Sequence, residues 1–218
     1  MSHSLINRNP WSNYLQRKMS KKMSTSQLTK KIILVTGATN GIGKVTATEL
    51  AQMGATVVIV GRNPQKTENV VLEIQKSLNG IGKVDSIIGD LSSLKDIRQV
   101  AEKFLSKYDR LDVLVNNAGG FFSRRLESVD GYEMTLALNH LNYYYLTDLL
   151  LNVLKSSLPA RIVNVSSSAH YGSKIKFNDL QRENFYNGWR AYSESKLMNI
   201  NFTRVLAQRL EGTGVTAN

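Results

Sequence analysis

The chain has 218 residues, of which 42% are hydrophobic and 21% are charged, so it fits one globular domain with a sizeable core. The absence of cysteine excludes disulfides and thiolate catalysis, three scattered histidines give no metal site, and no apolar run reaches the roughly 18 residues of a membrane-spanning helix. The formal net charge of +11 is typical of nucleic-acid-binding proteins, but its distribution argues against that function.

The positive charge is concentrated at the start of the chain. The first 31 residues hold seven basic residues and no acidic one, which leaves 21 basic and 17 acidic residues, a net charge of +4, for the rest. We therefore predict that residues 1–30 form a disordered basic tail, with an organelle-targeting segment as the alternative. Nothing in this tail interleaves aromatic and base-reading side chains, so no nucleic-acid partner is expected. A cytoplasmic protein is the simplest interpretation.

From residue 31 onward, short β-branched runs alternate with longer helix-like segments. Nearly continuous apolar runs are typical of parallel strands that helices cover on both faces. The pattern predicts an α/β domain over residues 31–218, a doubly wound Rossmann-type parallel sheet with helices on both faces. The predicted strands are 32–36, 56–60, 84–88, 111–115 and 161–165, and the predicted helices are 42–53, 65–79, 93–107, 133–157 and 190–211.

The last residues begin like a further strand. Residues 214–218 follow a long predicted helix, and a sixth strand needs more residues and usually a covering helix. We therefore expect the last strands of the domain to be missing and the domain to be incomplete at its C-terminus.

A glycine-rich turn follows the first predicted strand and opens the first predicted helix. Glycines at such positions let backbone amides approach a pyrophosphate, and the helix N-terminus favours the anion. Ala38 and Val45 stand where a phosphate-binding P-loop needs a glycine and a hydroxyl, so that motif is rejected, whereas a tight turn without ligand is the plain alternative. The residues expected to contact a dinucleotide here are Gly37, Thr39, Asn40, Gly41, Ile42 and Gly43.

The end of the second predicted strand indicates which dinucleotide binds. A cofactor without a 2′-phosphate would favour Asp or Glu here, but the sequence has Arg62 followed by Asn63. A guanidinium offers a fork of donors to a phosphate. The sequence therefore predicts NADP(H), with a solvated surface arginine as the alternative.

Two further strand ends carry polar or small residues. Asp90, with the Leu91 backbone beside it, could hydrogen-bond an adenine amine, or it could cap the helix that begins near residue 92. The segment Asn116-Asn117-Ala118-Gly119 could buttress the sheet and lie against a ribose. We expect Asp90, Leu91, Asn117, Ala118 and Gly119 to contact the cofactor.

Tyr192 and Lys196 carry the chemistry. Side chains four residues apart meet on one face of a helix. A lysine charge beside a tyrosine favours the phenolate and lowers its pKa from about 10 toward the working range. Such a pair can give or take the proton in the interconversion of an alcohol and a carbonyl group.

The motifs together resemble the short-chain dehydrogenase/reductase family over residues 31–218. The segments 161–167, 169–170 and 179–181 are similar to its retinol-dehydrogenase-like branch. The motifs that carry the resemblance are Thr36-Gly37-x-x-x-Gly41-x-Gly43, Asp90, Asn116-Asn117-Ala118-Gly119, Asn139, Ser166-Ser167-Ser168 and Tyr192-x-x-x-Lys196.

The resemblance implies a role for each catalytic residue. Tyr192 is the general acid or base, and Lys196 lowers its pKa and holds the nicotinamide ribose. Ser167, the second serine of its pair, orients the substrate oxygen, and Asn139 holds a water that links Lys196 to solvent. An ordinary polar residue in a helix is the alternative for Asn139.

The resemblance also implies an NADP(H)-dependent oxidoreductase for a hydrophobic alcohol or carbonyl compound, whether retinoid-like, lipid-like or xenobiotic. Homo-dimers or tetramers through helices 133–157 and 190–211 are expected. The expected missing C-terminal segment motivates an alternative from another class, a nucleotide-binding protein of the same fold without turnover.

Overall fold

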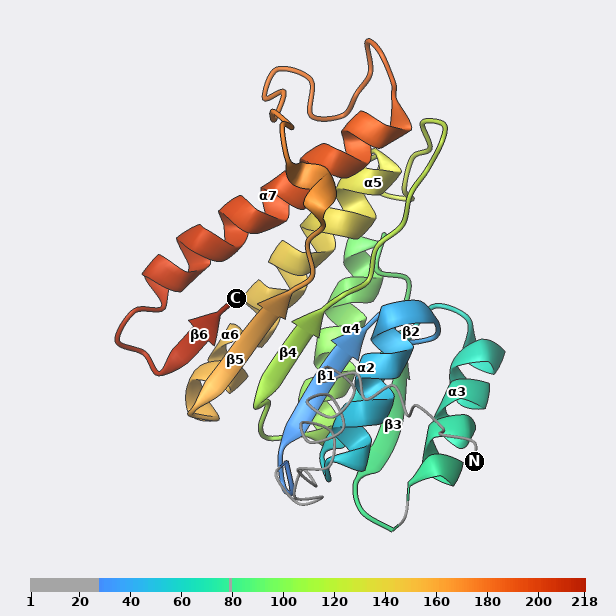
Figure 1. The fold of residues 1–218 in the computed structure, drawn as a ribbon, viewed down its shortest axis with the longest axis vertical. Helices are drawn as coiled ribbons and strands as arrows, with labels where there is room; N and C mark the ends of the chain where they lie inside the picture. The colour runs from blue at the N-terminus through green and yellow to red at the C-terminus, as the bar shows by residue number, and fades with distance from the viewer. Residues whose placement is uncertain (1–27, 79) are drawn as a thin grey trace, which may run out of the picture.

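The computed structural model describes residues 28–78 and 80–218 as a sheet between two layers of helices (Figure 1). The predicted tail lies outside the described residues except for its last three, 28–30, which form a turn before the first strand. The amide of Leu28 donates to Met53 O at 3.1 Å, and its side chain packs on the core. No helix in the described ranges has the length and apolar character to cross a membrane.

The sheet has six parallel strands in the order β3-β2-β1-β4-β5-β6. The order reverses beside β1, so the doubly wound fold predicted from the sequence is confirmed. The short sixth strand pairs with β5. The strands are β1 (Ile32–Thr36), β2 (Thr56–Gly61), β3 (Lys83–Ile88), β4 (Val113–Asn116), β5 (Ala160–Asn164) and β6 (Val215–Ala217).

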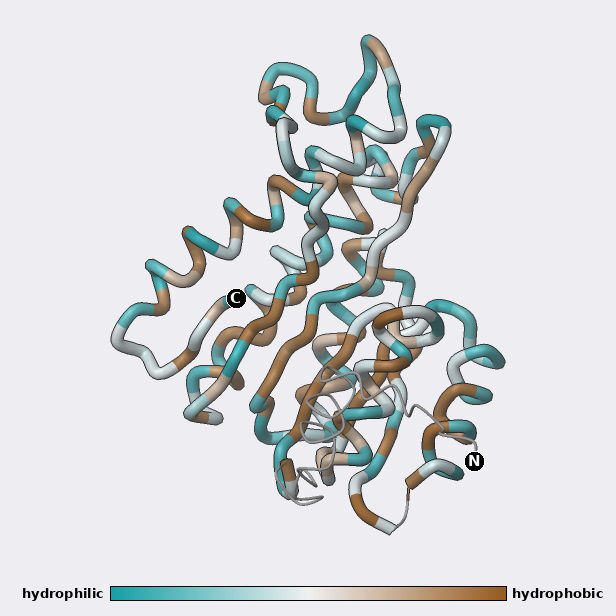
Figure 2. The backbone as a smooth tube through the Cα atoms, in the orientation of Figure 1, coloured by the Kyte–Doolittle hydropathy of each residue, from teal (hydrophilic) through white to brown (hydrophobic). Residues whose placement is uncertain are grey.

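Helices cover both faces because successive strand residues point to opposite sides. Ile33 and Val35 of β1 pack with α2 and α3 residues in one core, and Leu34 packs with α4, α6 and α7 residues in the other. Figure 2 shows hydrophobic residues running along β1, β4 and β5 between these layers. The long helices are α2 (Gly41–Gln52), α3 (Pro64–Ser77), α4 (Leu94–Lys107), α6 (Asn142–Ser156) and α7 (Gly188–Arg209).

The predicted helix 133–157 is interrupted, which corrects the sequence-based expectation of one continuous α-helix. A short α5 (Met134–Leu136) passes into a π-helical turn, η1 (Ala137–Leu141), before α6 begins. A π turn inserts one extra residue into the helical ladder and occurs often at functional sites. Here it contains Asn139.

The fourth strand also starts later than predicted, at Val113 rather than at residue 111. The Asp112 carboxylate accepts from the Ile32 amide at 2.8 Å and pairs with Lys31 and Arg110. The Asp112 backbone bonds to both neighbouring strands, whereas the Leu111 amide donates to Ser157 Oγ at 2.9 Å instead of to a strand. Pairing with Arg110 and Lys31 lowers the pKa of Asp112 against the effect of burial.

Candidate active site at the carboxyl edge of the sheet

The turn from β1 into α2 admits only glycine at two positions. Gly37 has φ +64°, and a Cβ there would lie 2.7 Å from the Ala118 Cα. A Cβ on Gly43 would collide with the Asn117 side-chain amide and with Gly37 O. The missing side chains let α2 approach the ends of β1 and β4, which brings its N-terminus to the carboxyl edge of the sheet.

The N-terminus of α2 is open to a ligand. Asn40 occupies the N-cap position in an extended conformation, but its side chain makes no capping hydrogen bond. Gly41, at φ +52°, has open space where a Cβ would stand, and Ile42 is exposed. Thr39 packs on Gly61 at the end of β2. Amides without a cap at a helix N-terminus suit an anion such as a pyrophosphate.

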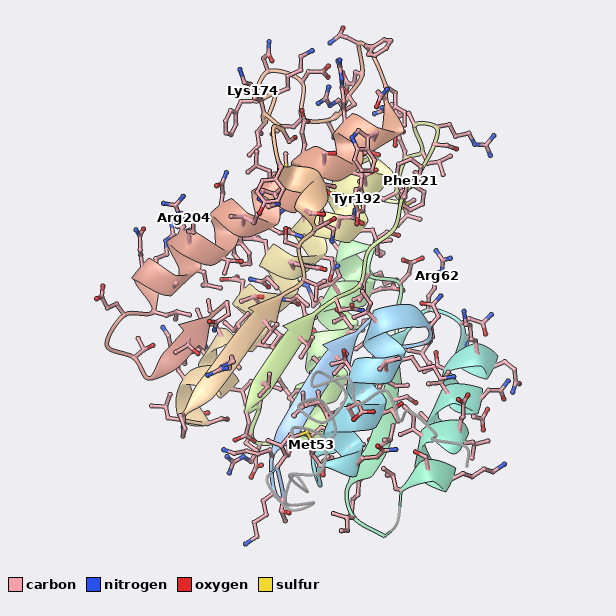
Figure 3. All side chains as sticks on the ribbon, in the orientation of Figure 1. Met53, Arg62, Phe121, Lys174, Tyr192 and Arg204 are labelled. Atoms are coloured by element: carbon pink, nitrogen blue, oxygen red, sulfur yellow. The ribbon has the colours of Figure 1, made fainter. Side chains whose placement is uncertain are left out.

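Arg62 and Asp90 lie beside each other at the neighbouring strand ends. The Arg62 guanidinium is exposed (Figure 3), and its Nη1 is 3.5 Å from the Asp90 carboxylate. Asn63 caps α3 by accepting from the Lys66 amide at 2.9 Å. Arg62 can thus turn toward a phosphate, since its ion pair with Asp90 is long and exposed.

The capping alternative for Asp90 is wrong. Asp90 Oδ1 accepts from the amide and hydroxyl of Ser92 at 3.0 and 2.7 Å, whereas Ser93 is the N-cap of α4. The turn at Asp90 is therefore held by its own carboxylate, with Leu91 buried beneath it.

The side chains of Asn116 and Asn117 both hold the sheet edge. Asn116 Nδ2 donates to Thr147 Oγ1 at 2.9 Å and to Asn164 Oδ1 at 2.8 Å. Asn117 Nδ2 donates to Thr36 O at 2.9 Å, and the Thr36 hydroxyl accepts from the Asn117 amide at 2.9 Å. These contacts fix the backbone that continues into Ala118 and Gly119.

Asn139 links this loop to α7. Its carboxamide accepts from the Gly120 amide at 2.8 Å and donates to Gly120 O at 2.9 Å and to Ser195 Oγ at 3.1 Å. Ser195 Oγ in turn donates to Tyr192 O at 2.7 Å. The side chain of Asn139 therefore positions Gly120 and α7, and the expected role of holding a water stays a prediction.

Lys196 is buried among neutral groups in α7. It is 4% exposed, and its Nζ donates to Val165 O at 3.1 Å. The same Nζ lies 5.7 Å from the ring centroids of both Tyr192 and Tyr143. Burial lowers the pKa of Lys196 to about 8. The cation thus lies over the ring of Tyr192 in a poorly hydrated environment, where its effect on a phenolate is strong.

Tyr192 faces the loop after β4. Its ring lies edge-on to Phe121 at 6.1 Å and 6.3 Å from the ring of Trp189. Figure 3 shows Tyr192 on α7 and Phe121 on the loop after β4 at the same end of the molecule. Two aromatic rings therefore lie beside the phenol ring of Tyr192.

The three serines after β5 differ in their contacts. Ser166 Oγ donates to Lys196 O at 2.9 Å and so holds α7 to the end of β5. Ser167 Oγ accepts from the Ala169 amide at 3.2 Å, as the N-cap of the 3-10 turn η2 (Ser168–His170). Because the Ser167 hydroxyl acts only as an acceptor in this bond, its proton can still be donated to a substrate oxygen, as its predicted role requires.

Sequence reasoning missed several residues that hold the site. Tyr143 lies under Lys196, and burial raises its pKa, so it remains a neutral phenol. Its position four residues after Asn139 was the signal that could have placed it there. Asn199, fully buried, donates to Asn139 O at 2.8 Å and contacts His140 Nδ1 at 2.9 Å. For Asn199 no sequence signal stood out.

A buried ion pair anchors the long loop before α7. Arg182 and Glu194 are 4% and 7% exposed, and they pair through both guanidinium and carboxylate atoms. Arg182 has φ +53°, which non-glycine residues rarely adopt. The pair holds the loop to α7. Within residues 28–78 and 80–218, no group of three or more His, Asp or Glu side chains could hold a metal.

The chain is similar in sequence to known proteins. A family model described as short chain dehydrogenase matches residues 31–218. Human retinol dehydrogenase 11 is 50% identical over 193 residues, which cover 88% of this chain and 60% of that protein. Human retinol dehydrogenase 14 is 42% identical over 200 residues, which cover 86% and 60%. The chain thus spans about 60% of the length of these curated relatives.

Solved structures share the fold. An uncharacterized protein from Mycobacterium paratuberculosis superposes with a TM-score of 0.78 at 36% identity, over 88% of this chain and 68% of that one. RhlG from Pseudomonas aeruginosa, solved as an NADP active-site complex, gives a TM-score of 0.73 at 30% identity, over 89% and 72%.

Proposed function

Because the chain belongs to the short-chain dehydrogenase family, we propose that it carries an oxidoreductase site that uses NADP(H) to interconvert an alcohol and a carbonyl group. One observation carries the proposal. The buried Lys196 lies 5.7 Å from the Tyr192 ring, at the sheet edge where the uncapped N-terminus of α2 opens. Dinucleotide binding and proton transfer can therefore occur side by side.

The residues at the sheet edge fit a dinucleotide. The uncapped amides at the start of α2 would hold the pyrophosphate, and the turn through Ala118 and Gly119 would lie along the ribose. Asp90 and Leu91 would border the adenine, and Arg62 would bind the 2′-phosphate. The NADP complex of the related RhlG supports this choice of cofactor. A bound nicotinamide would supply or accept the hydride.

The side chains on α7 and after β5 would move the proton. In reduction, the Tyr192 phenol donates its proton to the carbonyl oxygen, and in oxidation the phenolate takes the proton of the alcohol. The Lys196 cation stabilises that phenolate. The Ser167 hydroxyl orients the substrate oxygen, and Asn139 keeps Gly120 and α7 in register.

The substrate would be hydrophobic and retinoid-like. Phe121 and Trp189 stand beside Tyr192 with more than half of each side chain exposed, and they offer apolar surface to a substrate. The names of the related retinol dehydrogenases support the same class.

Self-association through α6 and α7 is a further part of this proposal. Their outer face carries a mostly apolar groove of about 810 Å³ that Tyr144, Leu151, Phe202 and Val205 help to line. A second copy of the chain would bury these side chains in a homo-dimer or tetramer.

Two measurements on the same protein test the activity. NADPH fluorescence on mixing reports binding, and NADPH absorbance with medium-chain and retinoid aldehydes reports turnover. We expect saturable binding of NADPH and turnover of at least one aldehyde. Tight binding without turnover on a broad panel would favour the nucleotide-binding alternative, and no binding would contradict both.

A further inference from the structure

His140 has two neighbours of different kinds. Its half-buried ring forms part of the wall of the groove on α6 and α7 and lies edge-on to Phe202, with 6.3 Å between the ring centroids. Its Nδ1 lies 2.9 Å from Oδ1 of the fully buried Asn199. The residue immediately before it is Asn139, whose side chain holds the loop after β4. His140 therefore stands between the groove and the polar interior of the candidate site.

The hydrogen bonds define both the orientation of the Asn199 amide and the tautomer of His140. Asn199 Nδ2 donates to the backbone carbonyl of Asn139 at 2.8 Å, and a carbonyl oxygen can only accept. The other end of the amide, Oδ1, therefore faces His140 and requires a proton on Nδ1. Burial lowers the pKa of His140, so the ring is neutral at neutral pH and its Nε2 carries no proton.

A path of hydrogen bonds begins at this pair and ends at the residue that carries the phenol. Both amides on the path are fully buried, so solvent cannot replace a bond that is lost. The second amide also holds the Gly120 amide and carbonyl. The members of the path, in order, are His140, Asn199, Asn139, Ser195 and Tyr192.

We propose that His140 is a positioning residue for the candidate active site. Its Nδ1–H orients Asn199, which holds the Asn139 carbonyl and keeps the π turn against α7. A Cβ at Gly119 would lie 3.2 Å from Asn139 Oδ1 and 3.6 Å from Lys196 Nζ, so these two side chains border the same turn. A displaced π turn therefore changes the surroundings of the ammonium that stabilises the phenolate. This catalytic consequence rests on the proposed function, whereas the positioning itself requires no turnover.

Two substitutions at one position separate the nitrogen from the ring. His140→Phe keeps a ring against Phe202 but removes the donor, which leaves Asn199 Oδ1 buried without a proton to accept. His140→Asn removes the ring but places its own Nδ2 near the position of the imidazole Nδ1, so the donor is kept. If His140 positions Asn199, His140→Asn is the milder change. If His140 only fills space, His140→Phe is the milder change.

Exchange of the Gly120 amide reports the position of Asn139 directly, because this amide donates to Asn139 Oδ1 at 2.8 Å. Hydrogen exchange measured by NMR on the full chain should be roughly tenfold faster or more in His140→Phe than in the wild type. In His140→Asn it should stay within about threefold of the wild type. Equal acceleration in both variants, faster exchange in His140→Asn, or no acceleration in either would overturn the proposal.

The tautomer can be measured on the unsubstituted protein. The chain has three histidines, and the ¹⁵N resonances of His140 are identified by their loss in His140→Phe. At neutral pH we expect a proton on Nδ1 and none on Nε2. A neutral ring with its proton on Nε2 would overturn the proposal, because His140 would then offer no donor to Asn199.

Turnover gives a readout that a purely structural role would not move. In His140→Phe we expect kcat to fall roughly 10–100-fold while the Kd for NADPH changes less than about threefold. The pH at which kcat for alcohol oxidation rises should move upward, because the ammonium then stabilises the phenolate less. His140→Asn should keep kcat within about threefold of the wild type.

The two kinds of measurement distinguish a failure of this proposal from a failure of the proposed function. An active enzyme whose kcat and pH profile are unchanged in His140→Phe would overturn the positioning role. A chain that binds NADPH without turnover would contradict the proposed function alone, and exchange of the Gly120 amide would still decide the role of His140.

Discussion

The two halves of the candidate site are built in different ways. The dinucleotide half is made of backbone: Gly37 and Gly43 lack side chains where any Cβ would collide, and Asn40 leaves the α2 amides uncapped. The catalytic half is made of buried side chains that hydrogen-bond to one another, from Asn139 through Ser195 to α7. Substitutions should therefore affect shape and binding in the first half, and proton chemistry in the second.

The largest effect is expected in the catalytic half. Tyr192→Phe removes the phenolic proton and keeps the ring against Phe121 and Trp189. We expect kcat to fall by roughly 10²–10⁴-fold while the Kd for NADPH changes little. Steady-state kinetics and a fluorescence titration on one preparation measure both. Comparable losses in kcat and in NADPH affinity would mean that the two halves are not separable.

The charge of Lys196 should make stability depend on pH. Its pKa is lowered from 10.5 to about 8 by burial, so the unfolded chain holds this proton more tightly than the folded one. Between pH 8 and 10.5, stability should rise with pH, by at most about 3 kcal/mol. Urea unfolding of the wild type and of Lys196→Met across this range isolates the effect as a difference. A difference that stays constant with pH would contradict a desolvated cation.

In the dinucleotide half, Gly43→Ala should act through shape. The added methyl group meets the Asn117 amide and Gly37 O, so the turn must open. We expect about 1–3 kcal/mol of lost stability and a clear loss of NADPH affinity. The matched control is Gly131→Ala, since a Cβ at Gly131 meets nothing within 4 Å and its positive φ carries only the local strain. Thermal unfolding and NADPH titration of both variants show whether the steric clash at Gly43 or the loss of a glycine alone causes the larger loss of stability and affinity.

The smallest effect concerns the choice of cofactor. Arg62→Ala removes an exposed guanidinium whose ion pair with Asp90 is 3.5 Å long. We expect the Kd for NADPH to rise about tenfold with little change for NADH, because a charged hydrogen bond to phosphate contributes roughly 1.5 kcal/mol. Parallel titrations with the two dinucleotides measure the ratio. An equal loss for both would show that Arg62 supports the loop rather than a phosphate.

Much of the fold was predictable because burial on both faces leaves a simple pattern. The strand at Ile32–Thr36 was predicted with its observed bounds, and the doubly wound order followed from alternation with helices. The π turn around Asn139 was not predictable, because the carbonyl of Asn139 accepts a hydrogen bond from Asn199, a residue of α7 that is distant in the sequence. The late start of β4 escaped for a similar reason: the Leu111 amide donates to the hydroxyl of Ser157, which lies far away in the sequence.

The candidate site was likewise predictable only in part. The motifs pointed to Tyr192, Lys196 and the glycine turn. The structure places Lys196 beside the Tyr192 ring and the glycine turn at the uncapped start of α2. The residues that support them belong to no motif. A buried amide such as Asn199 cannot be told from any other polar residue until its hydrogen-bond partners are known. Asp90 could not be assigned to its turn because capping and turn formation favour the same side chain.

Helix α7 makes two separate sets of contacts, one to the loop through Glu194 and Arg182 and one to the sheet edge through Lys196. Glu194 lies midway in sequence between Tyr192 and Lys196, and its carboxylate joins the guanidinium from the loop in a buried pair. The phenol and the ammonium remain with the sheet edge. Substitutions in the loop can therefore change the surface beside the candidate site while the Arg182–Glu194 pair keeps Tyr192 and Lys196 in place.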